Sequence, residues 1–182
     1  MVEALPKRMT VGEFLTWAER QPARYELHCG EVIAMSPERN RHGVVKLDTA
    51  IELRRAVAAT GVGCRVFVDG VSLVVNDTTS YVPDVVVHCG PFDLDRMTVD
   101  QPVIVVEVQS PSSTSIDSST KYFGYFSIES VVHYLILDPI QKRLAHHRRT
   151  GRGIESAIVT GGLLPLDPPG IEVDVAAFFA SV

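Results

Sequence analysis

The chain has 182 residues, of which 46% are hydrophobic and 21% are charged, and this composition is typical of a soluble globular domain with a sizeable core. We therefore predict one domain over residues 1–182, with its core at about 43–140. The net charge of −5 argues against a protein that coats nucleic acid, but it is compatible with an enzyme that has an acidic metal site. No apolar run reaches the ~20 residues of a membrane span, and the N-terminus lacks the apolar region of a signal peptide.

Cysteine usage bears on the cellular compartment. Cys29, Cys64 and Cys89 are odd in number and lack the CxxC spacing of a zinc site. We therefore expect neither zinc nor a disulfide framework, and the sequence predicts a cytoplasmic protein that does not associate with membranes.

A helix and a hairpin are predicted before residue 36. Thr10 and Glu13 form a capping box, in which each side chain satisfies a free backbone donor of the other residue, and Pro22 ends the helix. Arg24–Met35 consists of two short runs on either side of a Cys-Gly pair, which predicts a hairpin with Gly30 at the turn.

The middle of the chain predicts one helix and four strands. Apolar residues at three- and four-residue steps predict a helix over His42–Thr60. Cys64–Val75 alternates around an Asp-Gly pair at 69–70, which is a strong signal for a hairpin. Two further strands are predicted at the apolar runs Val85–Val87 and Val103–Val106.

The last third predicts a helix, a strand, a hairpin and a final helix. We expect a helix from Asp117 to about Ile128 and a strand over Val131–Leu137. A hairpin of Arg143–Arg148 and Ile154–Val159 follows, and Val173–Val182 is predicted to be a short apolar helix. This order favours an α/β (α+β) fold with a mixed central sheet flanked by helices and preceded by the N-terminal helix and hairpin.

Two predicted central strands each carry one carboxylate. Asp84 begins the first, and Glu107 lies near the end of the second. Burying a charge alone costs several kcal/mol, so these groups are expected to be paired or to bind a metal. Carboxylates on neighbouring strands can share a hard divalent cation. We expect Lys121, in the next helix, to fold back over the same place.

Positive charge is concentrated in the segment KRLAHHRRTGR, residues 142–152, and a smaller cluster consists of Arg39, Arg41 and His42. The basic segment is either a solvated hairpin face or a surface that contacts phosphate. In the second case, the nucleic-acid-binding residues are Arg148, Arg149, Arg152 and Lys142.

The pattern of Pro-Asp on one strand, Glu on the next and Lys in the following helix resembles the PD-(D/E)xK nuclease superfamily, which implies a restriction-endonuclease-like fold. More narrowly, the chain is similar to the bacterial Uma-two family of restriction-type endonucleases over about residues 10–178. The matching segments are YELHCGEVIAMSP (Tyr25–Pro37), His42, YVPDVVV (Tyr81–Val87), VIVVEVQSPSS (Val103–Ser113), Asp117, Lys121, Tyr125 and HYLILDP (His133–Pro139).

The resemblance implies metal-dependent hydrolysis of phosphodiester bonds in DNA. Asp84, Glu107 and the backbone carbonyl of Val108 would bind Mg²⁺, with Mn²⁺ as an alternative. The superfamily places a lysine two residues beyond the glutamate, but this chain has Gln109 there. Gln109, on the same strand face as Glu107, is expected to touch the site, and Lys121 is the lysine that matches the family pattern.

Three matters stay open at this point. Glu26 and Glu52 compete as the acid from an early segment that completes the site, and the motif match favours Glu26. The family analogy and the cleavage of two strands imply a homodimer. Because Gln109 replaces the usual lysine, the alternative function is a catalytically inactive nuclease fold that binds nucleic acid or a partner protein.

Overall fold

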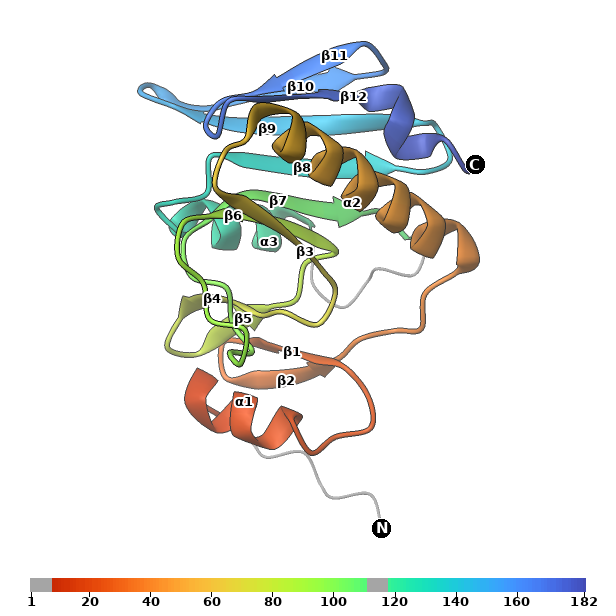
Figure 1. Cartoon of the computed structure of the whole chain (residues 1–182). Helices are drawn as coiled ribbons and strands as arrows, with labels where there is room; N and C mark the ends of the chain where they lie inside the picture. Colours follow the sequence, from red (N-terminus) through yellow and green to blue (C-terminus); the bar gives the residue numbers. More distant parts are fainter. Residues whose placement is uncertain (1–7, 111–117) are drawn as a thin grey trace.

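The computed structural model of the chain describes residues 8–110 and 118–182, and its centre is a sheet of six strands (Figure 1). The strand order is β10-β9-β8-β7-β6-β3. Only β7 and β8 pair in parallel among these neighbours, so the sheet is mixed, as the sequence predicts. The strands are β3 (Cys64–Val68), β6 (Val85–Cys89), β7 (Pro102–Val108), β8 (His133–Asp138), β9 (Arg143–Thr150) and β10 (Gly153–Val159).

Helices cover both faces of this sheet (Figure 1). On one face, α2 (Asn40–Thr60) packs through Val45 and Leu53 against the side chains of Val85 and Val87. On the other face, α3 (Ser118–Ser127) contributes residues to a second cluster that contains Val86. Alternate valines of one strand are thus buried on opposite faces, which explains why these strands read as continuous apolar runs. The predicted central sheet with flanking helices is confirmed.

A second sheet lies beside the first and has the order β2-β1-β5-β4 (Figure 1). Its strands are β1 (Tyr25–His28), β2 (Glu31–Ala34), β4 (Leu73–Asn76) and β5 (Thr79–Tyr81). The predicted N-terminal hairpin is confirmed as β1 and β2. The helix α1 (Val11–Ala18) packs on this sheet, where its Phe14 lies in one buried cluster with Leu27 of β1. Its predicted capping box is also confirmed, because the backbone N–H of Thr10 donates to Glu13 at 2.8 Å and that of Glu13 to Thr10 at 3.4 Å.

The predicted hairpin over Cys64–Val75 is wrong, because β3 and β4 belong to different sheets. Asp69 and Gly70 do have the positive φ angles, 53° and 73°, that an Asp-Gly turn requires. The chain nevertheless crosses between the sheets there, since β4 pairs with β5 and the side chain of Leu73 is fully buried in the second cluster. Local turn chemistry was therefore correct, but it did not determine the strand partner.

The predicted C-terminal helix is also only partly correct. Residues 163–174 form a hairpin of β11 (Leu163–Leu166) and β12 (Ile171–Asp174), which is followed by the short 3-10 helix η1 (Val175–Phe179). Strand alternation at Ile171 and Val173 buries every second side chain, and a helix there would not. Asp174 then caps η1 by accepting from the backbone N–H of Ala176 at 3.0 Å.

One disulfide bond contradicts the expectation from cysteine usage. Cys64 on β3 and Cys89 on β6 lie opposite each other in the antiparallel ladder and form a disulfide bond. Their separation of 25 residues carries no motif, and only the strand pairing reveals the contact. Cys29 is free and exposed. No helix within the described ranges is long and apolar enough to cross a membrane.

Candidate active site

Asp84 is held at the point where β6 begins beside the end of β7. Its backbone N–H donates to the carbonyl of Val106 at 3.1 Å, and its Oδ2 accepts from the backbone N–H of Val108 at 2.7 Å. The β6–β7 register pairs Val85 with Val106, so Glu107 on β7 lies next to the carboxylate of Asp84. Strand pairing therefore brings together the two carboxylates that the sequence places on neighbouring strands.

Glu107 and Glu26 converge on one ammonium group. Nζ of Lys121 donates to Oε1 of Glu26 at 2.8 Å and to Oε1 of Glu107 at 2.9 Å. The hydroxyl of Tyr125 also donates to Oε1 of Glu107 at 2.6 Å, and the backbone N–H of Val82 donates to Oε1 of Glu26 at 2.9 Å. Among the described residues, these hydrogen bonds all use Oε1 of the two glutamates.

The crossover helix α3 presents the lysine because β7 and β8 are parallel neighbours that need a connection across one face of the sheet. Lys121 and Tyr125 lie one turn apart and so point to the same side of α3. Gly124 lies between them, and a Cβ at that position would be 2.7 Å from Cε2 of Tyr81. The absence of a side chain at Gly124 therefore lets α3 lie close to the ring over which the ammonium of Lys121 is placed, 5.6 Å from its centroid.

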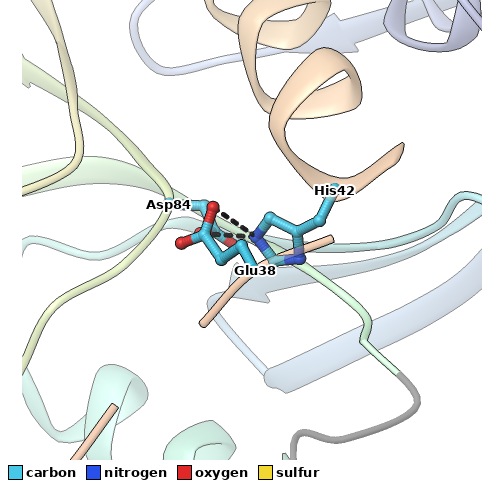
Figure 2. A group of neighbouring side chains, drawn as sticks. All are labelled: Glu38, His42 and Asp84. Carbon is cyan, nitrogen blue, oxygen red and sulfur yellow. Dashed lines mark hydrogen bonds and ion pairs between the residues drawn. The ribbon is translucent and has the colours of Figure 1, made fainter. Parts of the chain in front are cut away.

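A second group of charges holds the other side of Asp84 (Figure 2). Nε2 of His42 lies 2.9 Å from Oδ1 of Asp84, and Nζ of the buried Lys46 lies 3.2 Å from the same oxygen. Lys46 also donates to Glu38 at 2.7 Å and to both oxygens of Asp69 at 2.9 Å. His42 and Lys46 are one turn apart on α2, and the sequence analysis assigned neither to the site. Two signals were available: His42 is among the residues that match the family pattern, and Lys46 follows it at i+4 on the same helix face.

These contacts shift the pKa values of the two strand carboxyls in opposite directions. Burial raises the pKa of Asp84, but the hydrogen bond and charge of His42, the charge of Lys46 and the N–H of Val108 together lower it below its ordinary value. Asp84 is therefore ionised at neutral pH.

Glu107 behaves in the opposite way. Burial raises its pKa, the ammonium of Lys121 lowers it, and the negative charges of Asp84 and Glu26 raise it again, so that it reaches about 7. Burial lowers the pKa of Lys121, but the charges of Glu107 and Glu26 outweigh this and raise it above its ordinary value. Lys121 is therefore an ammonium at neutral pH.

A cavity of about 100 Å³ opens where these groups meet. Its lining combines the two strand carboxylates with the early acid, the helix lysine and the start of α2: Glu26, Met35, Ser36, Pro37, Glu38, His42, Val82, Asp84, Glu107, Val108, Ser110 and Lys121. A divalent cation at Asp84 and Glu107 fits this donor set, because hard cations prefer carboxylate oxygens as ligands.

Glu38, His42 and Asp84 form another candidate group, with ligand atoms within 4.8 Å of one another (Figure 2). Here, however, the ammonium of Lys46 already lies between Glu38 and Asp84, at 2.7 and 3.2 Å. This built-in cation compensates the two carboxylates. The side of Asp84 that faces Glu107 is therefore the better place for a metal ion.

Other residues that the sequence analysis singled out lie elsewhere. Glu52 faces away from the cavity, where it pairs with Arg55 at 2.6 Å and accepts from the backbone N–H of Asp174 at 2.8 Å, so Glu26 is the early acid at the site. Gln109, one residue beyond the end of β7, is exposed and does not line this cavity, although its backbone N–H still donates to the carbonyl of Leu137 on β8 at 2.8 Å. Asp117 lies outside the described residues.

The basic hairpin of β9 and β10 is confirmed, but several of its cations have structural contacts. The guanidinium of Arg149 donates to the carbonyls of Phe126, Ile128 and Val131, that of Arg148 to the carbonyl of Asp167 and the ammonium of Lys142 to that of Val182. Contact of this hairpin with DNA stays a prediction.

Comparisons with known proteins identify the family of the chain. The model of the Uma2 family, described as "Putative restriction endonuclease", matches residues 11–176. Two uncharacterized proteins of Synechocystis sp. are similar: sll1609 is 26% identical over 83% of this chain and 86% of its own, and slr1290 is 27% identical over 71% and 68%. A crystal structure of a putative nuclease from Anabaena variabilis superposes with a TM-score of 0.72 at 16% identity, covering 94% of this chain and 98% of that one. This last likeness supports the fold.

Proposed function

Since the chain belongs to the Uma2 family, described as "Putative restriction endonuclease", we propose that it hydrolyses phosphodiester bonds of DNA with the help of Mg²⁺, which Mn²⁺ can replace. Asp84 and Glu107 would hold the ion, together with the carbonyl of Val108. Glu26 and Lys121 complete the site. The proposal also includes a homodimer, because one cavity serves one scissile phosphate and cutting both strands of a duplex requires two such cavities.

One observation carries the proposal. Four groups that are far apart in sequence, Glu26, Asp84, Glu107 and Lys121, line a single cavity. Two carboxylates, those of Glu26 and Glu107, share the ammonium of Lys121 in this cavity, and the pKa of Glu107 is raised to about 7. Asp84 lines the same cavity and is paired with His42 and Lys46. Perturbed acids that converge on a cavity are typical of catalytic sites.

The residues of the chain would divide the work as follows. A bound divalent cation would neutralise charge on the phosphate and lower the pKa of water in the site. The ammonium of Lys121 would stabilise the negative charge that develops on the phosphate, and its raised pKa means that it acts as a cation and not as a base. Glu26 fixes the position of that ammonium, and Tyr125 orients Glu107 by donating to Oε1.

His42 and Lys46 both contact Oδ1 of Asp84. By holding Oδ1, they keep this carboxylate ionised and fix its orientation, while the N–H of Val108 holds Oδ2. The lysine that the superfamily places on the strand is absent at Gln109. Lys121 reaches the same cavity from the neighbouring helix, which supports its assignment as the substitute.

Nicking of supercoiled plasmid tests the proposal. We expect wild-type protein to nick in Mg²⁺ or Mn²⁺ and not in EDTA, and we expect Asp84→Asn, Glu107→Gln and Lys121→Met each to lower the rate by about 100-fold or more. Glu172→Gln is the matched control, because Glu172 is an exposed acid on β12 away from the cavity.

Equal nicking by all five proteins would show that a contaminant or another site does the cutting. No nicking by the wild type, together with DNA binding that survives in EDTA, would instead favour the alternative of an inactive nuclease fold that binds nucleic acid.

A further inference from the structure

A second, larger cavity adjoins the one that holds the acids. Its volume is about 540 Å³, and Glu38, His42 and Ser110 line both cavities, so the two are adjacent. Its remaining lining comes from the start of α2 and from the segments that follow β7 and β8: Arg39, Asn40, Arg41, Gln109, Pro139 and Ile140. A space of this size falls within the range of small-ligand sites and accommodates about one nucleotide unit.

The charge of the second cavity is opposite to that of the first. Arg39 and Arg41 are exposed, and neither forms an ion pair with any residue that the structure describes. Glu38, the acid of this lining, is compensated by Lys46 and Arg24, both at 2.7 Å. The cavity therefore presents two uncompensated guanidinium groups beside a cluster that suits a metal ion.

Hydrogen-bond donors at the start of α2, like the two guanidinium groups, favour an anionic ligand. The N-cap residue, Arg39, makes no side-chain cap, and the backbone N–H of Gly43 is the first to bond within the helix, to the carbonyl of Arg39 at 3.2 Å. Within the described ranges, the N–H groups of Asn40, Arg41 and His42 have no acceptor. Such donors at the positive end of a 21-residue helix favour an anion.

His42 supplies an independent sign of a missing partner. Its side chain is 9% exposed, and its buried Nδ1 makes no hydrogen bond with any residue that the structure describes, while Nε2 contacts Asp84. In Figure 2, Nδ1 is turned away from Asp84 and Glu38, and the residue lines both cavities. A buried polar atom without a partner is costly, so the structure leaves an unmet hydrogen bond at the boundary of the two cavities.

We propose that the second cavity binds the DNA backbone next to the scissile phosphate, with Arg39 and Arg41 neutralising flanking phosphates; this inference rests on the proposed function. The helix N–H groups donate to the phosphate oxygens at the boundary, beside Nδ1 of His42. Gln109 lines this cavity, so the residue that replaces the superfamily lysine contacts the nucleotide instead of the metal. The DNA thereby enters along the start of α2 and not across the basic hairpin.

The test measures binding without cleavage, so that its failure is separate from a failure of catalysis. A fluorescein-labelled DNA duplex is titrated with protein in EDTA at several salt concentrations. Arg39→Gln/Arg41→Gln is compared with wild type and with Arg20→Gln/Arg54→Gln, which removes the same charge from exposed positions elsewhere. Thermal denaturation checks that all three proteins are folded.

We expect the first double variant to bind more weakly and to lower the slope of log K against log salt by about 2, because two phosphates would no longer be neutralised by a guanidinium group. The Arg20/Arg54 control should keep the wild-type slope. Equal slopes for the wild type and both double variants, or an equal reduction in both variants, would overturn the proposal.

A local readout completes the test. In ¹H–¹⁵N spectra, a short oligonucleotide should shift the amide signals of Asn40, Arg41 and His42. Shifts confined to residues 143–159, on β9 and β10, would overturn the proposal and place the DNA on the basic hairpin. A wild type that binds in this way yet does not nick would leave the binding site standing and refute the catalytic proposal alone.

Discussion

Replacing Glu107 by glutamine should change how the stability of the metal-free protein depends on pH. The amide has nearly the shape of the carboxyl and is neutral at every pH, and its oxygen can still accept from Lys121 and Tyr125 at the place of Oε1. The variant therefore imitates the protonated form of Glu107 and removes only its ionisation.

The sign follows from the direction of the pKa shift. The pKa of Glu107 is about 7 in the folded protein, compared with 4.5 for an unperturbed glutamate. The folded chain therefore holds this proton more tightly, and the resulting stabilisation is complete below pH 4.5 and is lost as the pH rises through 7. At about 1.4 kcal/mol per pH unit, the difference amounts to about 3 kcal/mol at most.

Urea denaturation in EDTA at pH 5 and at pH 8 measures this difference. Between these pH values we expect the free energy of unfolding of the wild type to fall by about 2–3 kcal/mol relative to Glu107→Gln, because the two chains share every other titrating group. Parallel pH profiles for the two proteins would refute the reasoning, since they would mean that burial and the nearby acids do not raise the pKa of Glu107.

Three further predictions concern the surrounding structure. Gly124→Ala should lower the free energy of unfolding by about 1–3 kcal/mol in urea, since its Cβ would lie 2.7 Å from Tyr81; a more stable variant would show that helix propensity outweighs the clash. Lys46→Met should destabilise by about 3 kcal/mol, because it removes one partner from buried charges, and an unchanged melting temperature would contradict this. Reducing the disulfide of Cys64 and Cys89 should cost about 3 kcal/mol for its loop of 25 residues, and identical urea curves with and without reductant would speak against the bond.

The sequence alone was sufficient to predict that the two strand carboxylates and the helix lysine lie close together. Asp84 and Glu107 lie at the ends of apolar runs long enough to be central strands, and a charge in such a place needs a partner. The place of Glu26 was harder to predict, because an acid in a short hairpin usually faces solvent. Only the motif match favoured it over Glu52. The parallel crossover from β7 to β8 explains why Lys121 reaches the same cavity.

What the sequence could not predict depends on contacts between segments that are far apart. His42 and Lys46 are ordinary polar residues on a helix until α2 packs beside Asp84. Asp69 matched a hairpin turn, yet its strands separate into two sheets because burial of Leu73 outweighs the local preference. The disulfide likewise results from strand register, which composition does not contain.

The central claim is that Asp84 and Glu107 hold a divalent cation, and anomalous diffraction from crystals grown with Mn²⁺ tests it most directly. The account predicts an anomalous peak within bonding distance of carboxylate oxygens of both residues, with Lys121 still beside Glu26. A peak that bridges Glu38 and His42 with Glu107 left free, or no peak in this cavity at saturating Mn²⁺, would contradict it.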